Sequence, residues 1–414
     1  MMTARTTRRA FLVLASSLVT ATSLAGCGGS GAASVGGRDA GPYRVYVSID
    51  LSGPTKSYSE PIVDGLEIAA DRLNKDGGIA GRKVEVEAVD DQNNPTKAVS
   101  LLQKRLSDGN KPDLVYAGGS SSVSLSLLPV LSRSKILSMA GTVSNVLNDP
   151  AKFPYHFSVS PPGSAYAPAQ AKEAQAKGFK KVAMLYSNDA TGQSTLKLYT
   201  DAFQQTGIEL VSAGYESTAL DMTSQLQQLK AQNPDALVVN GYGTAALYAF
   251  RGRAQIGWDI PTYGDQLSSS FPLVKNLKAG DLKNVKVVTS STSVLDGDQS
   301  PLYADLVAAI KQGKHAAALS QMGYNIFVTG YDLLELVNVA AKQAKSADGP
   351  AVTKALEDLK APDPVPWLAS GKSGDATQYK YSATNHFPTA GPGLLVFVDP
   401  GTYNADGLYE PGQK

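Results

Sequence analysis

Residues 113–145 read DLVYAGGSSSVSLSLLPVLSRSKILSMAGTVSN and contain a strand, a turn, a helix and a second strand. Leu114–Ala117 and Ile136–Met139 are short apolar runs typical of buried strands, and the apolar residues between them recur at helical spacing. Glycine and hydroxyl residues follow both strands, at Gly118–Ser122 and Ala140–Thr142. In an open parallel sheet such strand ends face a ligand crevice, and a helix that opens there turns N–H groups toward it. The stretch therefore predicts an α/β fold that holds a small carboxylate at this edge.

The same alternation continues along most of the chain of 414 residues. Strands are expected at 44–50, 83–89, 155–159, 181–186, 208–215, 236–240, 262–264, 285–290 and 394–398, and long helices at 301–312 and 321–345. Strands separated by helices favour parallel sheets. Pro161–Gly163 interrupts the pattern, so we expect two lobes with a cleft between them. The first lobe is expected to comprise 43–159 plus 293–368, and the second 160–292 plus 369–405.

Residues 1–27 have the features of an export signal that ends in a lipobox. Thr7–Leu12 resembles a twin-arginine signal, although the general export route is also possible, and Leu24–Cys27 matches the lipobox of bacterial lipoproteins. An N-terminal membrane helix is the alternative, but the apolar run is short and polar in places. Cys27 is the only cysteine, which favours it as the lipid-attachment site, and residues 28–42 form a flexible tether. We expect an exported protein that is lipid-anchored to the outer face of the cytoplasmic membrane.

Composition excludes several classes of function. The formal net charge is +1, and nothing in the charge pattern indicates nucleic-acid binding. No cluster has the spacing of metal ligands, and no glycine loop has the pattern of a phosphate-binding site, so we expect no metal and no cofactor. The scattered residues His156, His315 and His386 are interpreted as structural, and Asp90 and Asp91 as turn-forming.

Six short segments together resemble those of branched-chain amino-acid-type substrate-binding proteins of ABC transporters, and they come in the same order. They are Leu51–Pro54, Asn74–Ile79, Val89–Gln92 with Pro95, Gly119–Val123 with Pro129, Ser138–Thr142, and Gly241–Gly243. The resemblance runs from about Tyr43 to the C-terminus. It implies a type I periplasmic-binding-protein fold, in which two parallel-sheet lobes joined by three crossovers close over a small ligand. It also implies a monomer that works with ABC transporter permease subunits.

The resemblance also implies a set of ligand-binding residues. They are Tyr58, Ser120, Ser121, Ala140, Gly141, Thr142, Tyr242, Asp265 and Gln266. The serines would grip the ligand α-carboxylate, the segment around Thr142 would meet the α-ammonium, and a tyrosine from each lobe would face the ligand. The alternative is that the serines only cap a helix, the tyrosines only pack, and Asp265 and Gln266 are solvated loop residues.

The sequence departs from the family pattern at Gln266, where amino-acid binders commonly have Glu. A neutral amide cannot neutralise an ammonium group. Either Asp265 takes this role after a one-residue shift, or the ligand lacks an α-ammonium group. An amino acid, an amide or urea-like compound, and an aromatic carboxylate therefore all stay possible.

We interpret the protein as a solute receptor that feeds an ABC importer, and two alternatives stay open. The same module could be a sensor that signals to a membrane partner. Ser132-Arg-Ser-Lys135 and Lys372–Gly374 also resemble motifs of serine acyl-transfer enzymes. However, that nucleophile begins a helix, whereas Ser132 is expected to end one, so we expect no enzyme activity.

Overall fold

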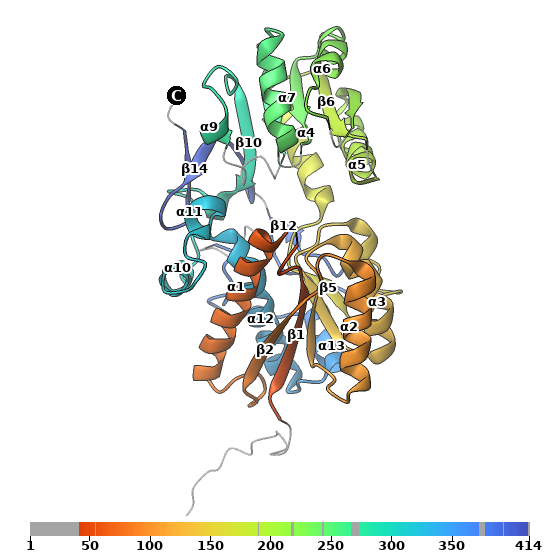
Figure 1. Cartoon of the computed structure of the whole chain (residues 1–414), viewed down its shortest axis with the longest axis vertical. Helices are drawn as coiled ribbons and strands as arrows, with labels where there is room; N and C mark the ends of the chain where they lie inside the picture. Colours follow the sequence, from red (N-terminus) through yellow and green to blue (C-terminus); the bar gives the residue numbers. More distant parts are fainter. Residues whose placement is uncertain are drawn as a thin grey trace, which may run out of the picture. The chain divides into compact units, whose positions relative to one another are not determined.

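The computed structural model describes residues 41–53, 55–188, 190–216, 219–241, 244–265, 273–371, 377–391 and 393–412. Two main sheets, each carrying helices, make up this part of the chain (Figure 1). All strand pairs in the first sheet are parallel, as are all but one in the second. The α/β class and the parallel sheets predicted from the alternating pattern are therefore confirmed.

The first sheet has the strand order β2-β1-β3-β4-β5. Its strands are β1 (Tyr43–Ile49), β2 (Val84–Asp90), β3 (Leu114–Ala117), β4 (Leu137–Ala140) and β5 (His156–Ser158). Val47 on β1 is paired with Ala88 on one side and with Tyr116 on the other. The quoted stretch thus supplies two central strands of this sheet, with α3 (Ser121–Ser134) between them.

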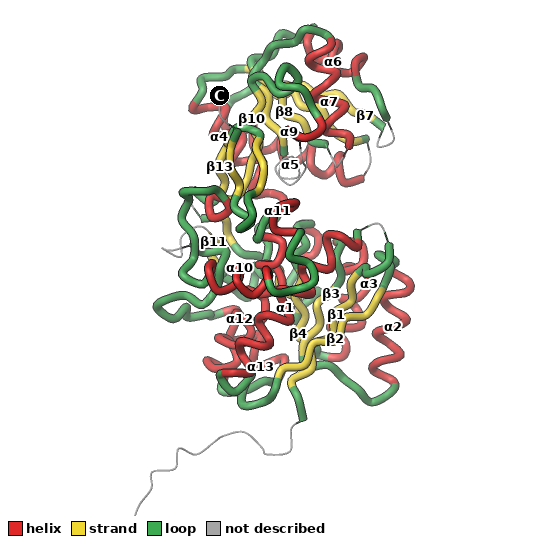
Figure 2. The backbone as a smooth tube through the Cα atoms, turned by 60° about the vertical axis from the view of Figure 1, so that its left-hand side comes forward, coloured by secondary structure: helices red, strands yellow, loops and turns green. Residues whose placement is uncertain are grey.

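Helices cover both faces of the first sheet because its strands carry apolar residues on both faces. Val45 and Val47 share a core with α1 (Lys56–Lys75) and α12 (Asn325–Ala344). Tyr46 and Val115 point to the other face and share a core with α2 (Pro95–Ser107) and α3. Figure 2 shows α1 and α12 on one side of the strands and α2 and α3 on the other. The helix α13 (Gly349–Glu357) packs with the first of these cores.

The second sheet has the strand order β13-β10-β9-β8-β6-β7, in which only the edge strand β13 is antiparallel to its neighbour. Its strands are β6 (Lys181–Ser187), β7 (Glu209–Tyr215), β8 (Ala236–Val239), β9 (Thr262–Gly264), β10 (Val285–Ser290) and β13 (Leu395–Val398). The helix α4 (Tyr166–Ala176) precedes β6, and α5 (Ala190–Thr206), α6 (Thr223–Lys230) and α7 (Thr244–Gln255) follow β6, β7 and β8. Each of these strands, including β13, lies within two residues of a predicted one.

Short elements complete the described residues. They are η1 (Asn145–Leu147), η2 (Gly163–Ala165), α9 (Leu273–Asn276), η3 (Ser291–Ser293), α10 (Tyr303–Lys311), α11 (Ala318–Met322), and the strand pairs β11 (Thr377–Gln378) with β12 (Thr389–Ala390) and β14 (Gly401–Tyr403) with β15 (Tyr409–Pro411). The prediction of one helix over 321–345 is wrong in its first turn. Gly323, with φ of 80°, separates α11 from α12, and a Cβ there would lie 2.4 Å from the Tyr403 ring.

The buried carboxylate of Asp332 joins α12 to the segments around Leu368 and Tyr379. Asp332 accepts hydrogen bonds from the backbone N–H groups of Leu368 (2.7 Å) and Ala369 (2.9 Å) and from the Tyr379 hydroxyl (3.0 Å). Burial raises the pKa of Asp332 to about 7, against the opposing effect of these hydrogen bonds. Tyr379 and Tyr381 lie in the hydrophobic core beside the first sheet. The residue boundaries of the two lobes stay a prediction.

No helix among the described residues is long and apolar enough to span a membrane.

Candidate functional site

The first predicted anchor is the start of α3. Ser120 is its N-cap residue, with extended backbone angles, yet the Ser120 side chain makes no capping hydrogen bond. Its hydroxyl instead donates to Asn93 Oδ1 (2.6 Å) and lies 3.1 Å from Ser122 Oγ. Ser121 is the first residue of the helix. The Ser120 hydroxyl therefore does not cap the helix. The N–H groups at the positive end of α3 are available to an acceptor on a ligand.

The second predicted anchor lies just beyond β4. Thr142 is only 5% exposed, and its Oγ1 atom is buried without a hydrogen-bond partner among the described residues. Its carbonyl oxygen accepts a hydrogen bond from Ser158 Oγ (2.8 Å). Ala140 is buried, and its carbonyl oxygen accepts from the Val159 N–H group (3.0 Å). A buried hydroxyl that lacks a hydrogen-bond partner destabilises the folded protein. A ligand that offers a hydrogen-bond partner to the Thr142 hydroxyl would therefore be bound favourably.

Carboxylates at the ends of β1 and β2 shape the loop that leads to Tyr58. Asp50 accepts hydrogen bonds from the backbone N–H groups of Gly53 (2.5 Å) and Thr55 (2.8 Å), and from the Thr55 hydroxyl (2.8 Å). Burial acts to raise the pKa of Asp50, but these hydrogen bonds outweigh it, so the pKa is lowered. Asp50 is therefore an ionised structural residue that fixes the loop.

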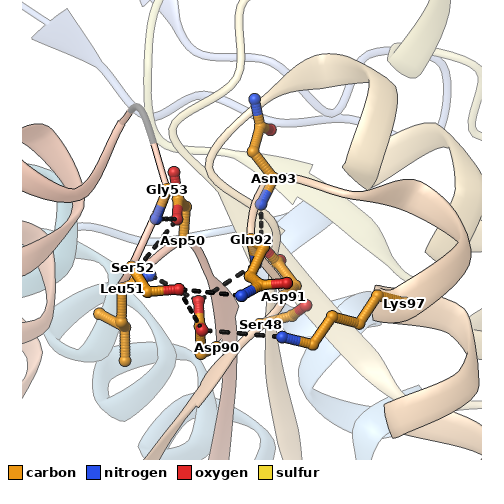
Figure 3. A network of polar contacts seen from close by, with 10 residues as sticks. All are labelled: Ser48, Asp50, Leu51, Ser52, Gly53, Asp90, Asp91, Gln92, Asn93 and Lys97. Atoms are coloured by element: carbon orange, nitrogen blue, oxygen red, sulfur yellow. Dashed lines mark hydrogen bonds and ion pairs between the residues drawn. The ribbon is translucent and has the colours of Figure 1, made fainter.

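Asp90 and Asp91 hold the neighbouring turn. Asp90 accepts from the Leu51 N–H group (2.8 Å) and from Ser52 Oγ (2.7 Å), and Asp91 accepts from Ser48 Oγ (2.7 Å) and the Asn93 N–H group (2.8 Å) (Figure 3). Burial raises the pKa of Asp91. The interpretation of this pair as turn-forming fits these contacts. No group of three or more His, Cys, Asp or Glu residues suited to a metal ion occurs in the described ranges.

In the second lobe, Asp265 lies just after β9 and is 5% exposed. It accepts a hydrogen bond from Asn240 Nδ2 (2.9 Å) and has a further interaction. Asn240 follows β8, and its Oδ1 atom is buried without a partner in the part of the chain that the structure describes. Sequence reasoning missed Asn240, although it directly precedes the noted Gly241–Gly243 segment. Two predicted ligand residues, Tyr242 and Gln266, lie outside the described residues, as does Cys27.

A cavity of about 230 Å³ lies beside Gly141. Residues from both sheets and from the start of α12 line it, including Val288–Ser290, Asn325 and Leu395. Two described residues of the predicted site, Tyr58 and Gly141, line this cavity, whereas Ser120, Ser121, Ala140, Thr142 and Asp265 do not. The volume lies below the roughly 300–1,000 Å³ of sites for drug-sized ligands, which suits a small compound.

Tyr166, at the start of α4, is a lining residue that sequence reasoning missed. Burial raises the pKa of its hydroxyl, and the nearby Tyr58 and Asp265 raise it further. Tyr58 itself is 46% exposed, which is unusual for a large side chain in this structure. Tyr166 therefore lines the cavity together with Tyr58, and its hydroxyl is close enough to Asp265 for the two groups to interact electrostatically.

The serine acyl-transfer motif gains no support from local geometry. Ser132 lies in the last turn of α3, and its carbonyl oxygen accepts from the Lys135 N–H group (3.2 Å) in the helix C-cap. The serine nucleophile of such enzymes stands at the start of a helix, whereas Ser132 stands near the end of α3. Lys372 of the second motif lies outside the described residues.

Comparison with known proteins agrees with this arrangement. Residues 42–390 match a family model described as periplasmic binding protein. A Leu/Ile/Val-binding protein of Rhizobium johnstonii is 24% identical over 347 residues, which cover 80% of this chain and 88% of that relative.

Two solved structures show the fold. A type 1 periplasmic binding protein from Bordetella pertussis superposes with a TM-score of 0.70 at 20% identity, covering 89% of this chain and 100% of that one. A solute binding protein of an ABC transporter from Rhodopseudomonas palustris, in complex with 3,4-dihydroxybenzoic acid, superposes with a TM-score of 0.66 at 21% identity, covering 89% and 96%. The chain therefore belongs to the periplasmic binding protein family and has its type I fold, as the six ordered motifs indicated.

Proposed function

We propose that the protein is an extracytoplasmic solute-binding lipoprotein that captures a small organic carboxylate, such as an amino acid or a related compound, and delivers it to an ABC importer. Family membership supports the binding role and the extracytoplasmic location. The relatives are binding proteins rather than enzymes. One relative is described as binding Leu, Ile and Val, and a structural neighbour holds a dihydroxybenzoic acid, so both ligand classes deserve testing.

The single observation that carries this proposal is the buried, unpartnered hydroxyl of Thr142. It follows β4, at the carboxyl edge of the sheet where α3 also begins. We assign the ligand carboxylate to Ser120, Ser121 and the N-terminus of α3, and an adjacent polar group of the ligand to Thr142. Each such hydrogen bond is worth about 0.5–1.5 kcal/mol in net terms, and more when the acceptor is charged.

The second lobe would complete the site when it closes. Asp265 and Asn240 form a hydrogen-bonded pair that would face an ammonium group or a hydroxyl group of the ligand. Tyr242 and Gln266 are part of the proposed site on the basis of the sequence alone. Closure follows only if the ligand binds the closed form better than the open form. In this proposal the lobes comprise 43–159 plus 293–368 and 160–292 plus 369–405, and the closed pair is what the permease recognises.

Lipid attachment at Cys27 is part of the proposal. Acylation contributes about 0.8 kcal/mol per buried CH₂ group, so a multiply acylated cysteine would hold the protein at the membrane. Metabolic labelling with a radioactive fatty acid tests this directly. The wild-type protein should be labelled and Cys27→Ala should not, whereas equal labelling of both would rule out Cys27 as the site.

A thermal-shift screen against amino acids, amides and small carboxylates tests the binding role, with calorimetry on each hit. A ligand at 100 times its Kd adds about 2.7 kcal/mol of stability, which gives a clear shift. Thr142→Val should weaken the binding of a hit about tenfold, because one hydrogen bond of about 1.4 kcal/mol is lost. Thr200→Val, on the exposed face of α5, is the matched control. No shift with any solute, or unchanged binding by Thr142→Val, would contradict the proposal.

A further inference from the structure

The cavity meets the proposed anchors at Gly141. A Cβ atom at this position would lie 2.4 Å from Thr329 Cγ2 and 3.4 Å from Ser160 Oγ, so Gly141 packs closely against Thr329 and a side chain there would collide with it. Thr329 and Ser160 both line the cavity. Gly141 also directly precedes Thr142 in the chain, so the body of a ligand held at Thr142 would lie in this cavity.

The lining offers no partner for a second charge. None of the described residues that line the cavity is Asp, Glu, Lys, Arg or His. Asp332 lies behind the lining residue Tyr379, is fully buried, and already accepts hydrogen bonds from Tyr379 and two backbone N–H groups. A charged group in the ligand body would be buried without an opposite charge, which strongly disfavours its binding.

The lining nevertheless has unused hydrogen-bonding capacity. The side-chain hydroxyl groups of Ser160, Tyr166, Thr289 and Thr329 make no hydrogen bond within the described residues, and Thr289 is only 7% exposed. Each hydroxyl can donate one hydrogen bond and accept two. An aliphatic ligand body would cover these hydroxyl groups and leave them unpaired, which weakens binding. A hydroxyl or amide group in the ligand would pair with them instead.

We propose that this cavity selects a carboxylate whose body is uncharged and carries a hydroxyl or amide group, which Thr289 and Thr329 bind. The inference deepens the proposed function and rests on it. The inference excludes purely aliphatic amino acids, and also acidic and basic amino acids, as the preferred ligands. Thr289 comes from β10 of the second sheet and Thr329 from α12 over the first, so the same contacts bring in both lobes.

Calorimetric titration with two series of probes tests this selectivity. The first series is 4-hydroxybenzoate, the nearly isosteric 4-methylbenzoate, and terephthalate, which has a second charge. The second is L-glutamine, L-norleucine and the isosteric L-glutamate. In at least one series the hydroxyl or amide member should bind at least tenfold more tightly than the aliphatic member and at least 100-fold more tightly than the charged one.

The double variant Thr289→Val, Thr329→Val removes both hydroxyls while keeping their shape. It should lower the preference for hydroxyl over methyl at least fivefold, and Thr200→Val should leave the preference unchanged. If the double variant does not fold, Thr329→Val alone is measured. If probes bind but neither series shows the expected preference, or if the preference is unchanged in the variant, the inference is overturned and the proposed function still stands. If neither these probes nor any solute of the screen binds, the proposed function and the inference both fail.

Discussion

The substitution Asp332→Asn should change how the stability of the protein depends on pH. The Asp332 carboxyl has a pKa of about 3.8 in the unfolded chain, and burial raises its pKa to about 7 in the folded protein. Between these values the unfolded chain is ionised at this residue while the folded chain keeps its proton. The folded state then binds more protons, so the free energy of unfolding falls as the pH rises through this window. About three pH units, at about 1.36 kcal/mol each, make a loss of about 4 kcal/mol.

Urea unfolding of wild type and Asp332→Asn at several pH values between 5 and 8 isolates this effect. The asparagine does not titrate, and the other groups cancel in the difference between the two proteins. The free energy of unfolding of wild type relative to the variant should fall by roughly 2–3 kcal/mol from pH 5 to pH 8. Asp71→Asn, which changes an exposed carboxyl on α1, should show no such trend.

Parallel pH profiles for wild type and Asp332→Asn would refute this reasoning. Such a result would mean that the three donors around Asp332 keep it ionised in the folded protein, despite its burial. The titratable groups that interact with it include Glu335 on the same helix and the hydroxyls of Tyr324, Tyr331, Tyr379 and Tyr381. Of these, only Tyr379 contacts the Asp332 carboxylate directly.

Two further predictions concern stability. Burial and the neighbouring His386 lower the pKa of His156 to about 3, so the unfolded chain takes up a proton below pH 6.5 that the folded chain does not. Between pH 6.5 and pH 4, the free energy of unfolding measured in urea should therefore fall by about 3 kcal/mol more for wild type than for His156→Asn. Equal decreases for the two proteins would contradict this. A Cβ at Gly330 would lie 2.1 Å from the Ile62 carbonyl oxygen, so Gly330→Ala should lower the free energy of unfolding by at least about 1–3 kcal/mol. Gly280→Ala, with nothing within 4 Å, is the control, and similar losses for both would show that α1 and α12 can separate at little cost.

Local sequence pattern was sufficient to predict the β3–α3–β4 unit and the parallel sheets. Short apolar runs can bury both faces of a strand, and small residues are tolerated where a strand ends at a crevice. The predicted strand Val285–Ser290 agrees with β10 without adjustment, and the Pro95 start of α2 follows from the ring of proline, which suits the first turn of a helix.

Features that depend on distant contacts could not be predicted from local pattern. Gly323 interrupts the predicted helix because it packs against Tyr403, which belongs to another part of the chain. Tyr166 and Asn240 have no motif of their own, and their place in the site depends on how the two sheets are joined. Asp332 looks like an ordinary polar position in a helical pattern, and only tertiary packing makes it a buried junction.

The measurement that tests the central claim most directly is the distance between the two lobes with and without ligand. Spin labels can be placed by Val146→Cys and Leu220→Cys, since these side chains are 62% and 72% exposed and each follows the carboxyl end of a strand in a different sheet. Pulsed electron paramagnetic resonance, in a Cys27→Ala background, then reports the distance distribution. Addition of a ligand found in the thermal-shift screen should move the distribution to shorter distances. An unchanged distribution at saturating ligand would contradict capture between closing lobes.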